Sequence, residues 1–399
     1  MSEWKKVKLG EVAEIFSGYA FKSSEMNKES GTPLIKIKNI NNFGVSKNCD
    51  TYLNKDVDLN KYKRFKLQEI DFLVAMTGQG SVGRIGKMKS FTPNFYVNQR
   101  VAIVRPDRET CEPYYAYLSV ATNERQDELF NKANGAGQPN ISAKQIGELE
   151  INLPSLPTQH RIATILSRYD SLIENYQKQI KLLEEAAQRL YKEWFVDLHF
   201  PGHENTKIVD GVPEGWEKKS VSQLGGYLNG FAFKPSDWQE TGKPIIKIKE
   251  MGNGVSDETP RNNGERVPVK YLVKAGDLLF SWSATLMVIV WTGEEGWLNQ
   301  HLFKVTPAKG IGREFLLQSI SNAIAEFSNL TTGSTMKHIQ RNKLDQVFVN
   351  TPSSIVMEKY NKVAESIRAQ ILNISSQIRL LTEARDRLLP KLMSGEIAV

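Results

Sequence analysis

The sequence carries one structural motif twice, first as Gly18-Tyr19-Ala20-Phe21-Lys22 and again as Gly230-Phe231-Ala232-Phe233-Lys234. A second pair follows, Pro33-Leu34-Ile35-Lys36-Ile37-Lys38 and Pro244-Ile245-Ile246-Lys247-Ile248-Lys249, and residues 180–186 match residues 378–384. The period of about 200 residues is too long for a solenoid, whose units have roughly 20 to 50 residues. It predicts a duplicated domain with a connector. Such a protein presents two similar surfaces, which suits an extended, bipartite ligand.

Composition is that of a globular protein, with 399 residues of which 40% are hydrophobic and 24% charged. No apolar run approaches the roughly 18 residues that cross a bilayer, and Met1-Ser2-Glu3-Trp4-Lys5-Lys6 lacks the apolar core of a signal peptide. We therefore expect a cytoplasmic protein. The net charge of +7 permits nucleic acid as a partner without requiring it. Cys49 and Cys111 are expected to be free thiols.

Each half is expected to form a strand-rich mixed domain. The alternation in Leu34-Ile35-Lys36-Ile37-Lys38 predicts a half-exposed strand with Lys36 and Lys38 on one face. Further strands are expected at residues 71–76 and 97–104, with counterparts at 277–280 and 302–305. Helices are expected near residues 113–122 and 313–326.

The connectors carry the clearest periodicity, because apolar residues recur at alternating spacings of four and three. In the first connector they are Ile162, Leu166, Tyr169, Ile173, Tyr176, Ile180, Leu183, Ala187, Leu190 and Trp194. Shifted by 198 positions they become Tyr360, Ala364, Ile367, Ile371, Ile374, Ile378, Leu381, Arg385, Leu388 and Leu392. This pattern is typical of a coiled-coil seam, in which only Arg385 is out of character. Pro390 is expected to break or kink the second helix near its end.

Two matching seams are most simply buried by pairing within the chain. An antiparallel pair would relate the two domains by a pseudo-twofold axis, at opposite ends of a rod. A helix of about 36 residues is about 54 Å long, which corresponds to roughly 15 base pairs. Two domains could then contact two short DNA segments separated by a gap. The seam also fits a dimerisation rod that carries two unrelated ligand-binding domains.

A glycine-rich segment, Gly78-Gln79-Gly80-Ser81-Val82-Gly83, matches the G-x-G-x-x-G pattern of dinucleotide-binding loops. Residues 84–89 nevertheless predict a turn and a strand, whereas that fingerprint needs a helix directly after the glycines. We therefore expect a tight hairpin whose glycines supply positive φ angles. Gln79, Ser81 and Arg84 on this loop are candidates for contacts in a DNA groove.

Catalytic and metal-binding motifs are not found in the sequence. Among the histidines only His199 and His203 have a ligand-like spacing, and they flank Pro201-Gly202, where a helix is expected to end. We expect them to be solvated turn residues. A G-x-S-x-G elbow, a paired-carboxylate nuclease motif and an NPPY or DPPY amino-methylation motif are missing. We therefore expect no catalytic site, metal or cofactor in this chain.

Polar and basic residues recur in corresponding loops of the two halves. Asn98-Gln99-Arg100 aligns with Asn299-Gln300-His301, and Gln138, Asn140 and Lys144 align loosely with Met336, His338 and Asn342. Asn, Gln, Arg and His side chains contact base edges, whereas Lys suits phosphate. The candidate DNA-contacting residues are Lys36, Lys38, Gln79, Ser81, Arg84, Asn98, Gln99, Arg100, Gln138, Asn140, Lys144, Lys247, Lys249, Ser281, Ser283, Asn299, Gln300, His301, Lys337, His338 and Arg341.

The chain resembles the specificity subunits of type I restriction-modification systems over essentially its whole length. Residues 4–9, Gly215-Trp216, the Gly-x-Ala-Phe-Lys repeats, residues 276–280 and residues 154–159 carry the resemblance. The most specific string is Leu388-Leu389-Pro390-Lys391-Leu392-Met393-Ser394-Gly395-Glu396-Ile397. The resemblance implies an α+β chain with target-recognition domains at residues 1–157 and 200–354. It also implies helical spacers at residues 158–199 and 355–399 that pair antiparallel.

This resemblance implies that each domain recognises one half of an interrupted DNA sequence, while the helices set the gap and bind methyltransferase subunits, of which two are expected. Restriction and translocation subunits are further implied partners. S-adenosylmethionine, ATP and magnesium are expected in those partners rather than in this chain.

The second half departs from the first at Ser281-Trp282-Ser283-Ala284, which replaces Thr77-Gly78-Gln79-Gly80. Such a difference fits two different half-site specificities, and it argues against transferring base contacts from one half to the other. Two other functions remain possible at this point. One is a coiled-coil scaffold with two protein-binding domains, and the other is a self-contained DNA methyltransferase or nuclease that uses the Gly78 loop.

Overall fold

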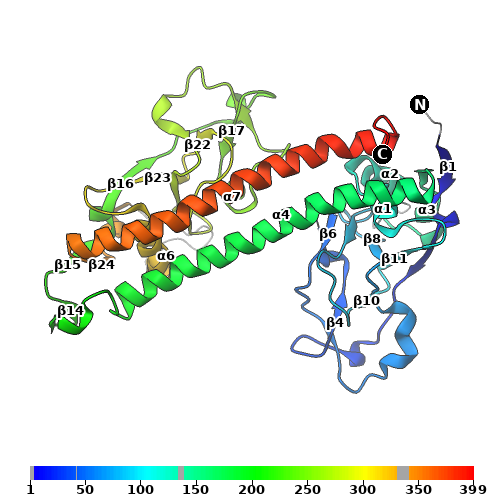
Figure 1. Ribbon diagram of the computed structural model, residues 1–399, viewed down its shortest axis with the longest axis horizontal. Helices are drawn as coiled ribbons and strands as arrows, with labels where there is room; N and C mark the ends of the chain where they lie inside the picture. The colour runs from blue at the N-terminus through cyan, green and yellow to red at the C-terminus, as the bar shows by residue number, and fades with distance from the viewer. Residues whose placement is uncertain (1–3, 42, 134–138, 330–340) are drawn as a thin grey trace. The chain divides into compact units, whose positions relative to one another are not determined.

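The structure is a computed structural model, which describes residues 4–41, 43–133, 139–329 and 341–399 (Figure 1). The chain divides into two compact units. The first comprises residues 1–171 and 383–399, and the second comprises residues 172–382. Each unit combines one strand-rich domain with segments of two long helices.

Three sheets build the first unit. The largest has the strand order β2 (Ala13–Ser17), β11 (Val101–Pro106), β8 (Phe72–Ala75), β9 (Ile85–Lys87), β6 (Phe43–Val45) and β5 (Ile40–Asn41). A second sheet has the order β10 (Tyr96–Val97), β4 (Thr32–Ile35), β7 (Tyr52–Leu53) and β3 (Met26–Asn27). A third pairs β1 (Lys5–Lys8) with β12 (Glu150–Leu153). All pairs are antiparallel except β4 with β10 and β6 with β9, so the sheets are mixed.

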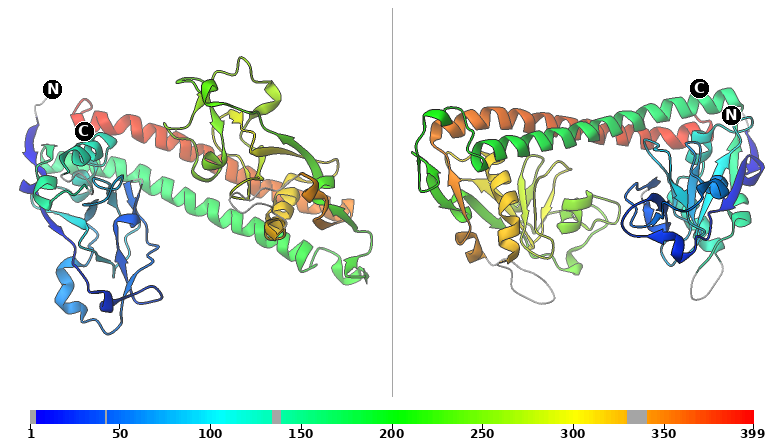
Figure 2. Two further views of the ribbon diagram at one scale, coloured as in Figure 1. Left: turned by 180° about the vertical axis from the view of Figure 1, so that it is seen from behind. Right: turned by 90° about the horizontal axis from the view of Figure 1, so that it is seen from below.

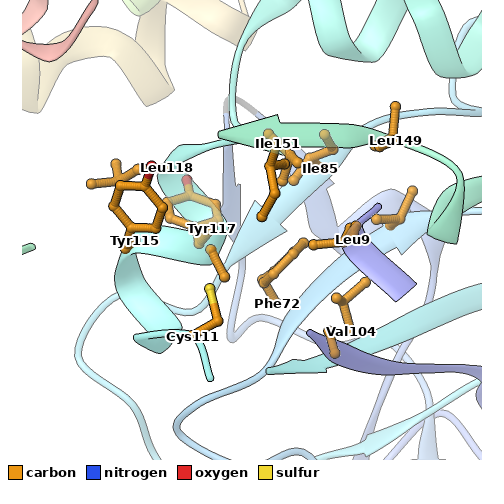
Figure 3. Packing of buried hydrophobic residues seen from close by; sticks show 14 of the residues in the cluster. Leu9, Phe72, Ile85, Val104, Cys111, Tyr115, Tyr117, Leu118, Leu149 and Ile151 are labelled. Atoms are coloured by element: carbon orange, nitrogen blue, oxygen red, sulfur yellow. The ribbon is translucent and has the colours of Figure 1, made fainter. Parts of the chain in front are cut away.

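Helices cover the large sheet of the first unit. They are α1 (Pro113–Leu118), α2 (Asn123–Lys132), α3 (Ala143–Gly147), the beginning of α4 (Leu156–Tyr191) and the end of α7 (Ser354–Ser394). Phe72 and Val104 of the sheet, Tyr115 of α1 and Ile151 of β12 belong to one buried cluster (Figure 3). Burying large apolar side chains from sheet and helices together is what stabilises this unit. Cys111 lies in the same cluster as a free thiol, and Cys49 is also free, as expected.

The second unit repeats this plan. Its main sheet has the order β16 (Gly225–Asn229), β23 (Leu302–Pro307), β20 (Leu278–Ser281) and β21 (Met287–Val290). A second sheet has the order β18 (Arg261–Asn262), β17 (Lys243–Ile246), β22 (Gly296–Leu298) and β19 (Leu272–Val273). Smaller pairs join β15 (Glu217–Ser220) to β24 (Phe348–Thr351) and β13 (Ile208–Val209) to β14 (Val212–Pro213). The helices are α5 (Ile248–Asn253), α6 (Arg313–Asn329) and parts of α4 and α7.

The duplication extends to the pairing of individual strands. β4 and β10 are parallel in the first unit, and β17 and β22 are parallel in the second. In both units four adjacent strands of the main sheet follow the same antiparallel order, β2-β11-β8-β9 against β16-β23-β20-β21. In Figure 2, right, the strands of each unit lie to one side of the helical segments that belong to it. The predicted fold of two similar strand-rich domains with long helices is therefore confirmed.

Two predicted strands were wrong in detail. Residues 97–104 are not one strand, because Asn98, Gln99 and Arg100 form a turn between β10 and β11, closed by the Val101 N–H donating to the Asn98 carbonyl at 3.0 Å. Lys36 and Lys38 do not lie on a strand either. β4 ends at Ile35, and a 3-10 turn follows at Ile37–Asn39, where the Asn39 side chain accepts the Lys36 N–H at 3.0 Å. A capping residue three positions later thus outweighs the period-two alternation.

The equivalent lysines of the second unit lie in the same structural context. β17 ends at Ile246, Lys247 precedes α5, and the Glu250 carboxylate accepts the Lys247 N–H at 3.1 Å. The side chain that accepts the lysine N–H after the strand is therefore Asn39 in the first half and Glu250 in the second.

The long helices run in opposite directions inside each unit. In the first unit, Ile162 and Leu166 of α4 share a buried cluster with Leu392 of α7, and Asp170 accepts a hydrogen bond from Arg385 at 2.6 Å. In the second unit, the ring of Phe195, in a π-helical turn after α4, lies 4.8 Å from that of Tyr360. Nearer the middle of the helices, the Glu184 carboxyl interacts with the charge of Arg368. The segments of α4 and α7 are therefore antiparallel within each unit.

None of the apolar positions predicted for the seam is exposed. The continuous coiled coil and its pseudo-twofold axis stay predictions. Pro390 does not end α7, which continues to Ser394. One lost backbone hydrogen bond near the end of the helix is offset there by Leu388, Leu389 and Met393, which pack against the core of the first unit. In the described part of the chain, no helix has the length and apolar character needed to cross a membrane.

Candidate nucleic-acid interface

The repeated Gly-x-Ala-Phe-Lys motif lines the turn that bears Asn98, Gln99 and Arg100. The Tyr19 N–H donates to the Val97 carbonyl at 2.9 Å, and the Gln99 N–H donates to the Tyr19 carbonyl at 3.1 Å. A Cβ atom added at Gly18 would lie 2.3 Å from the Val97 carbonyl oxygen. This close approach requires glycine, because no side chain fits between the two backbones.

In the second unit, the second copy of the motif lies against the turn at Asn299 in the same way. The Phe231 N–H donates to the Leu298 carbonyl at 2.8 Å, and a Cβ atom at Gly230 would lie 2.1 Å from the Asn299 carbonyl oxygen. The most conspicuous repeat in the sequence therefore holds two equivalent turns in place, Asn98 to Arg100 and Asn299 to His301.

Lys36 lies beside the first of these turns. Ile35 and Val97 are partners in the parallel pair of β4 and β10, and the Asn98 N–H donates to the Ile35 carbonyl at 3.0 Å. Burial lowers the pKa of Lys36, and the positive charges of Lys38, Lys28 and Arg100 lower it further. We call Lys28, Lys36, Lys38 and Arg100 the basic cluster. Like charges held this close favour a bound polyanion.

The Gly78 loop borders the same turn. The Met76 N–H donates to the Arg100 carbonyl at 2.9 Å, the Gly78 N–H donates to the Pro139 carbonyl at 3.2 Å, and Thr77 forms a bridge with Asn140. The structure thus brings together the Gly78 loop, the Asn98 turn and Asn140, which are far apart in sequence. Gln79 and Asn140 are exposed, Ser81 is half-buried, and Arg84 donates to the Asn41 side chain at 3.0 Å.

The hairpin predicted for the glycine-rich segment is confirmed. It connects the antiparallel strands β8 and β9, and Gly78, Gly80 and Gly83 have φ angles of 105°, 70° and 83°. Because a strand rather than a helix follows, this loop does not have the geometry of a dinucleotide-binding site.

The second unit places different chemistry at the equivalent position. Lys247 adjoins the turn because the Asn299 N–H donates to the Ile246 carbonyl at 3.1 Å. Its ammonium group lies 4.4 Å from the centre of the Trp238 ring, which is a cation–π contact. Lys249 forms an ion pair with Glu258 at 3.0 Å. Burial lowers the pKa of Lys247, while the Glu250 carboxylate raises it.

The loop that follows β20 replaces the Gly78 hairpin. Ser281 and Ser283 are buried, and the Ser281 hydroxyl donates to the carbonyls of Ser283 at 3.1 Å and Thr285 at 2.7 Å. The Ser281 side chain therefore maintains the loop. Trp282 is half-buried, its ring centre lies 5.8 Å from that of His301, and its indole N–H donates to the Asn229 side chain at 3.2 Å.

The remaining candidate residues differ in how exposed their side chains are. Asn98 and Asn299 are buried, and each side-chain oxygen accepts a backbone N–H two residues later, at 3.4 Å in both turns. Gln99 and Arg100 are exposed, whereas Gln300 and His301 are half-buried. Lys144 is exposed on α3, which packs against β2 rather than against the Asn98 turn. Lys38 forms an ion pair with Asp50.

Four candidates cannot be placed as side chains. Gln138, Lys337 and His338 lie outside the described residues, and so does Met336, which was aligned with Gln138. Arg341 begins a 3-10 turn, Arg341–Asp345.

The histidine pair that was expected in a turn lies on either side of the turn at Pro201 and Gly202, and His203 begins a short 3-10 helix. His199 and His203 are exposed, and their Nδ1 atoms lie 3.0 Å from the Glu193 carboxylate and the Phe200 carbonyl. Among the described residues, no group of three or more His, Cys, Asp or Glu side chains is arranged to hold a metal ion.

Sequence reasoning missed Lys28, Trp238 and Trp282. Lys28 joins the basic cluster only through the fold, since it lies eight positions before Lys36 in the sequence. Trp282 was detectable, because an aromatic residue that replaces a glycine-rich loop in an otherwise repeated scaffold indicates a changed binding surface.

The chain is similar in sequence to known proteins. The family model described as the type I restriction modification DNA specificity domain matches residues 1–185 and 213–359. The type I restriction enzyme MjaIX specificity subunit of Methanocaldococcus jannaschii is 25% identical over 345 residues, covering 82% of this chain and 78% of that protein. The HindI specificity subunit of Haemophilus influenzae is 23% identical over the full length of both chains.

Among solved structures, the S subunit of a type I restriction-modification system from M. genitalium has the same fold. Its crystal structure matches with a TM-score of 0.58 at 16% identity, covering 98% of this chain and 96% of that one. Because the family model covers most of both halves, the duplicated chain described above belongs to the type I restriction-modification DNA specificity family.

Proposed function

We propose that this chain recognises a bipartite, asymmetric DNA target, with one half bound by each strand-rich domain. The observation that supports this most directly is the pair of equivalent turns. Asn98-Gln99-Arg100 and Asn299-Gln300-His301 are held by the same glycine motif and the same kind of parallel strand pair, yet their third residues and the loops beside them differ. One scaffold with two different contact surfaces suits two different half-sites.

The side chains proposed to contact DNA are those that the structure leaves accessible around the turns. In the first domain they are Lys36, Arg100, Gln99, Gln79 and Asn140. In the second they are Gln300, His301 and Trp282. Asn98, Asn299 and Ser281 act indirectly in this proposal, because their buried side chains hold the loops in shape, and Ser283 is buried as well.

The helices have the second role in this proposal. Paired as a continuous antiparallel rod, they would set the distance between the domains and bind the methyltransferase subunits, of which we propose two. Restriction and translocation subunits would complete the complex. We propose that this chain is non-catalytic and cytoplasmic, and that S-adenosylmethionine, ATP and magnesium are bound by the partners.

Selection from a random duplex library tests the proposal. The chain, purified with its methyltransferase subunits, is mixed with the library, and the bound duplexes are sequenced. One interrupted motif with two short specified halves is expected. Exchanging the side chains of residues 282–285 should change one half of the motif and leave the other half unchanged. A continuous motif, or no enrichment at all, contradicts the proposal.

The same preparation separates the alternatives. A protein scaffold would capture the methyltransferase subunits without enriching any duplex. A self-contained enzyme would transfer methyl groups to DNA when the chain is supplied alone with S-adenosylmethionine.

A further inference from the structure

The two equivalent turns differ in charge. Arg100 follows Asn98-Gln99 in the first domain, and His301 follows Asn299-Gln300 in the second. Both positions directly precede the second strand in the order of the main sheet, β11 or β23. The fold therefore places an always-charged guanidinium in one domain where the other has an imidazole.

The charged groups around the two turns increase this difference in charge. In the first domain, Arg100 is exposed, and the charges of Lys38, Lys28 and Arg100 all act on Lys36. In the second domain, the Lys247 ammonium group lies over the Trp238 ring, and the charge of the Glu250 carboxylate acts on it to raise its pKa against the effect of burial. Lys249 is paired with Glu258, as the equivalent Lys38 is with Asp50 in the first domain. The cation that adjoins the second turn, Lys247, is thus already engaged by an aromatic ring and a carboxylate, whereas only like charges act on the equivalent Lys36.

Net charge follows the same trend. Residues 1–157 contain 22 Lys and Arg against 18 Asp and Glu, a net charge of +4. Residues 200–354 contain 17 against 16, a net charge of +1. Most of the excess positive charge in the two domains is therefore in the first.

Aromatic surface replaces charge in the second domain. Trp282 and His301 lie with ring centres 5.8 Å apart, beside the turn, and both are half-buried. In the first domain the same loop carries Gly78, Gln79 and Gly80 and no aromatic residue. An indole ring can pack against deoxyribose or a thymine methyl group, a contact that releases no counterions.

We infer that the two domains bind DNA by different physical means. The first supplies salt-sensitive phosphate contacts through Lys36 and Arg100, and the second supplies a salt-insensitive apolar contact through Trp282 packed beside His301. This inference rests on the proposed function. It adds that the first domain dominates attraction at low salt, while the second retains its contribution at high salt.

The test measures dissociation constants at several salt concentrations. The full chain in complex with its methyltransferase subunits binds a fluorescent mixed-sequence duplex at pH 8, from roughly 50 to 200 mM KCl. Arg100→Gln and Lys36→Gln should each reduce the slope of log K against log salt by about 1. Arg108→Gln is the matched control, because Arg108 is exposed at the opposite end of β11 and should leave the slope unchanged.

Variants of the second domain should behave differently. Trp282→Ala should weaken binding about tenfold at every salt concentration with an unchanged slope. His301→Gln should also leave the slope unchanged, whereas His301→Arg should increase it by about 1. Lys309→Gln is the control for this domain, since Lys309 is exposed beyond the far end of β23. Trp282→Phe keeps an aromatic ring and should retain most of the affinity, which separates loss of contact from loss of folding.

Two results would overturn the inference. One is a slope that falls equally with His301→Gln and Arg100→Gln. The other is a Trp282→Ala variant whose affinity equals that of the wild type at high salt. A wild-type complex that binds no DNA at any salt concentration would instead refute the proposed function itself.

Discussion

Glu314 and Arg368 form a doubly hydrogen-bonded ion pair inside the second unit. The Nε atom of Arg368 lies 2.7 Å from Oε1 of Glu314, and one terminal nitrogen lies 3.0 Å from Oε2. Their side chains are only 1% and 5% exposed. The pair joins α6 of the recognition domain to α7, so it fixes the domain to the helix that follows it.

Breaking this pair on one side should destabilise the second unit strongly. Glu314→Gln leaves the buried Arg368 guanidinium without its hydrogen-bonded carboxylate, and such a loss costs about 3–5 kcal/mol. The free energy of unfolding, measured with urea, should fall by that amount. The double variant Glu314→Leu/Arg368→Met removes both charges and should be much closer to wild type. A single variant that costs less than about 1 kcal/mol, as exposed pairs do, would show that the pair is not buried as described.

The first unit has a different contact at the equivalent place. Asp170 lies 198 residues before Arg368, and it accepts hydrogen bonds from Tyr114 of α1 and from Arg385 of α7. The carboxylate is therefore on the long helix here, whereas in the second unit the long helix carries the cation. Arg385, the one polar residue in the predicted seam, is explained by this contact.

Alkaline pH should weaken the first unit in part through Tyr114. Burial and the neighbouring Asp170 charge raise the pKa of Tyr114 above its usual value. A raised pKa means that the folded state holds the proton more tightly, so this contribution is complete below about pH 10 and is lost as the pH rises further. Tyr114→Phe should reduce the fall in unfolding free energy above pH 10 by up to about 1.4 kcal/mol per pH unit. An unchanged pH dependence would contradict the assignment.

Substituting the repeated glycines should distort the turns that they hold. Gly18→Ala places a Cβ atom against the backbone oxygens of Val97 and Asn98, at 2.3 and 2.5 Å, so the turn must shift. A cost of about 1–3 kcal/mol is expected from such overpacking, together with weaker DNA binding. Thermal unfolding and duplex binding measure the two effects. Gly226→Ala is the matched control, because its Cβ atom would have no neighbour closer than 4.0 Å. Equal behaviour of the two variants would refute the role given to Gly18.

Shortening both long helices should change the gap in the recognised target. Removing residues 178–184 of α4 and the equivalent residues 376–382 of α7 takes out one heptad from each, about 10 Å of helix or roughly three base pairs. Because whole heptads are removed, the apolar positions keep their faces. Selection from a random duplex library should then return the same two half-sites with a different spacing. An unchanged spacing would exclude the helices as the spacer.

Much of the fold follows from patterns that the sequence repeats. The heptads predict α4 and α7, and the paired motifs predict two similar domains, because each pattern reflects a face that must be buried. The period-two alternation predicted a strand that includes Lys36 and Lys38, but the Asn39 cap ends the strand after Ile35. Pro390 was expected to break or kink its helix, but α7 continues past it because neighbouring residues pack against the core of the first unit.

The candidate site was predictable as a set of loops but not as a surface. Asn98 and Asn299 have the side chains of base-contacting residues. Each side-chain oxygen instead accepts a backbone N–H within its own turn. Lys28 and Asn140 reach the site only through tertiary contacts, which no local pattern encodes. Trp282 lies in the loop that differs between the halves, and its packing against His301 appears only in the folded unit.

Mapping N6-methyladenine across the host genome, with and without this gene, tests the central claim most directly. If the chain directs an adenine methyltransferase to a bipartite target, deletion should abolish methylation at one interrupted motif with two different specified halves. Restoring the gene should restore that motif, and a variant altered at residues 282–285 should move methylation to a motif that differs in only one half. An unchanged methylation pattern after deletion, or loss of a continuous motif, would contradict the claim.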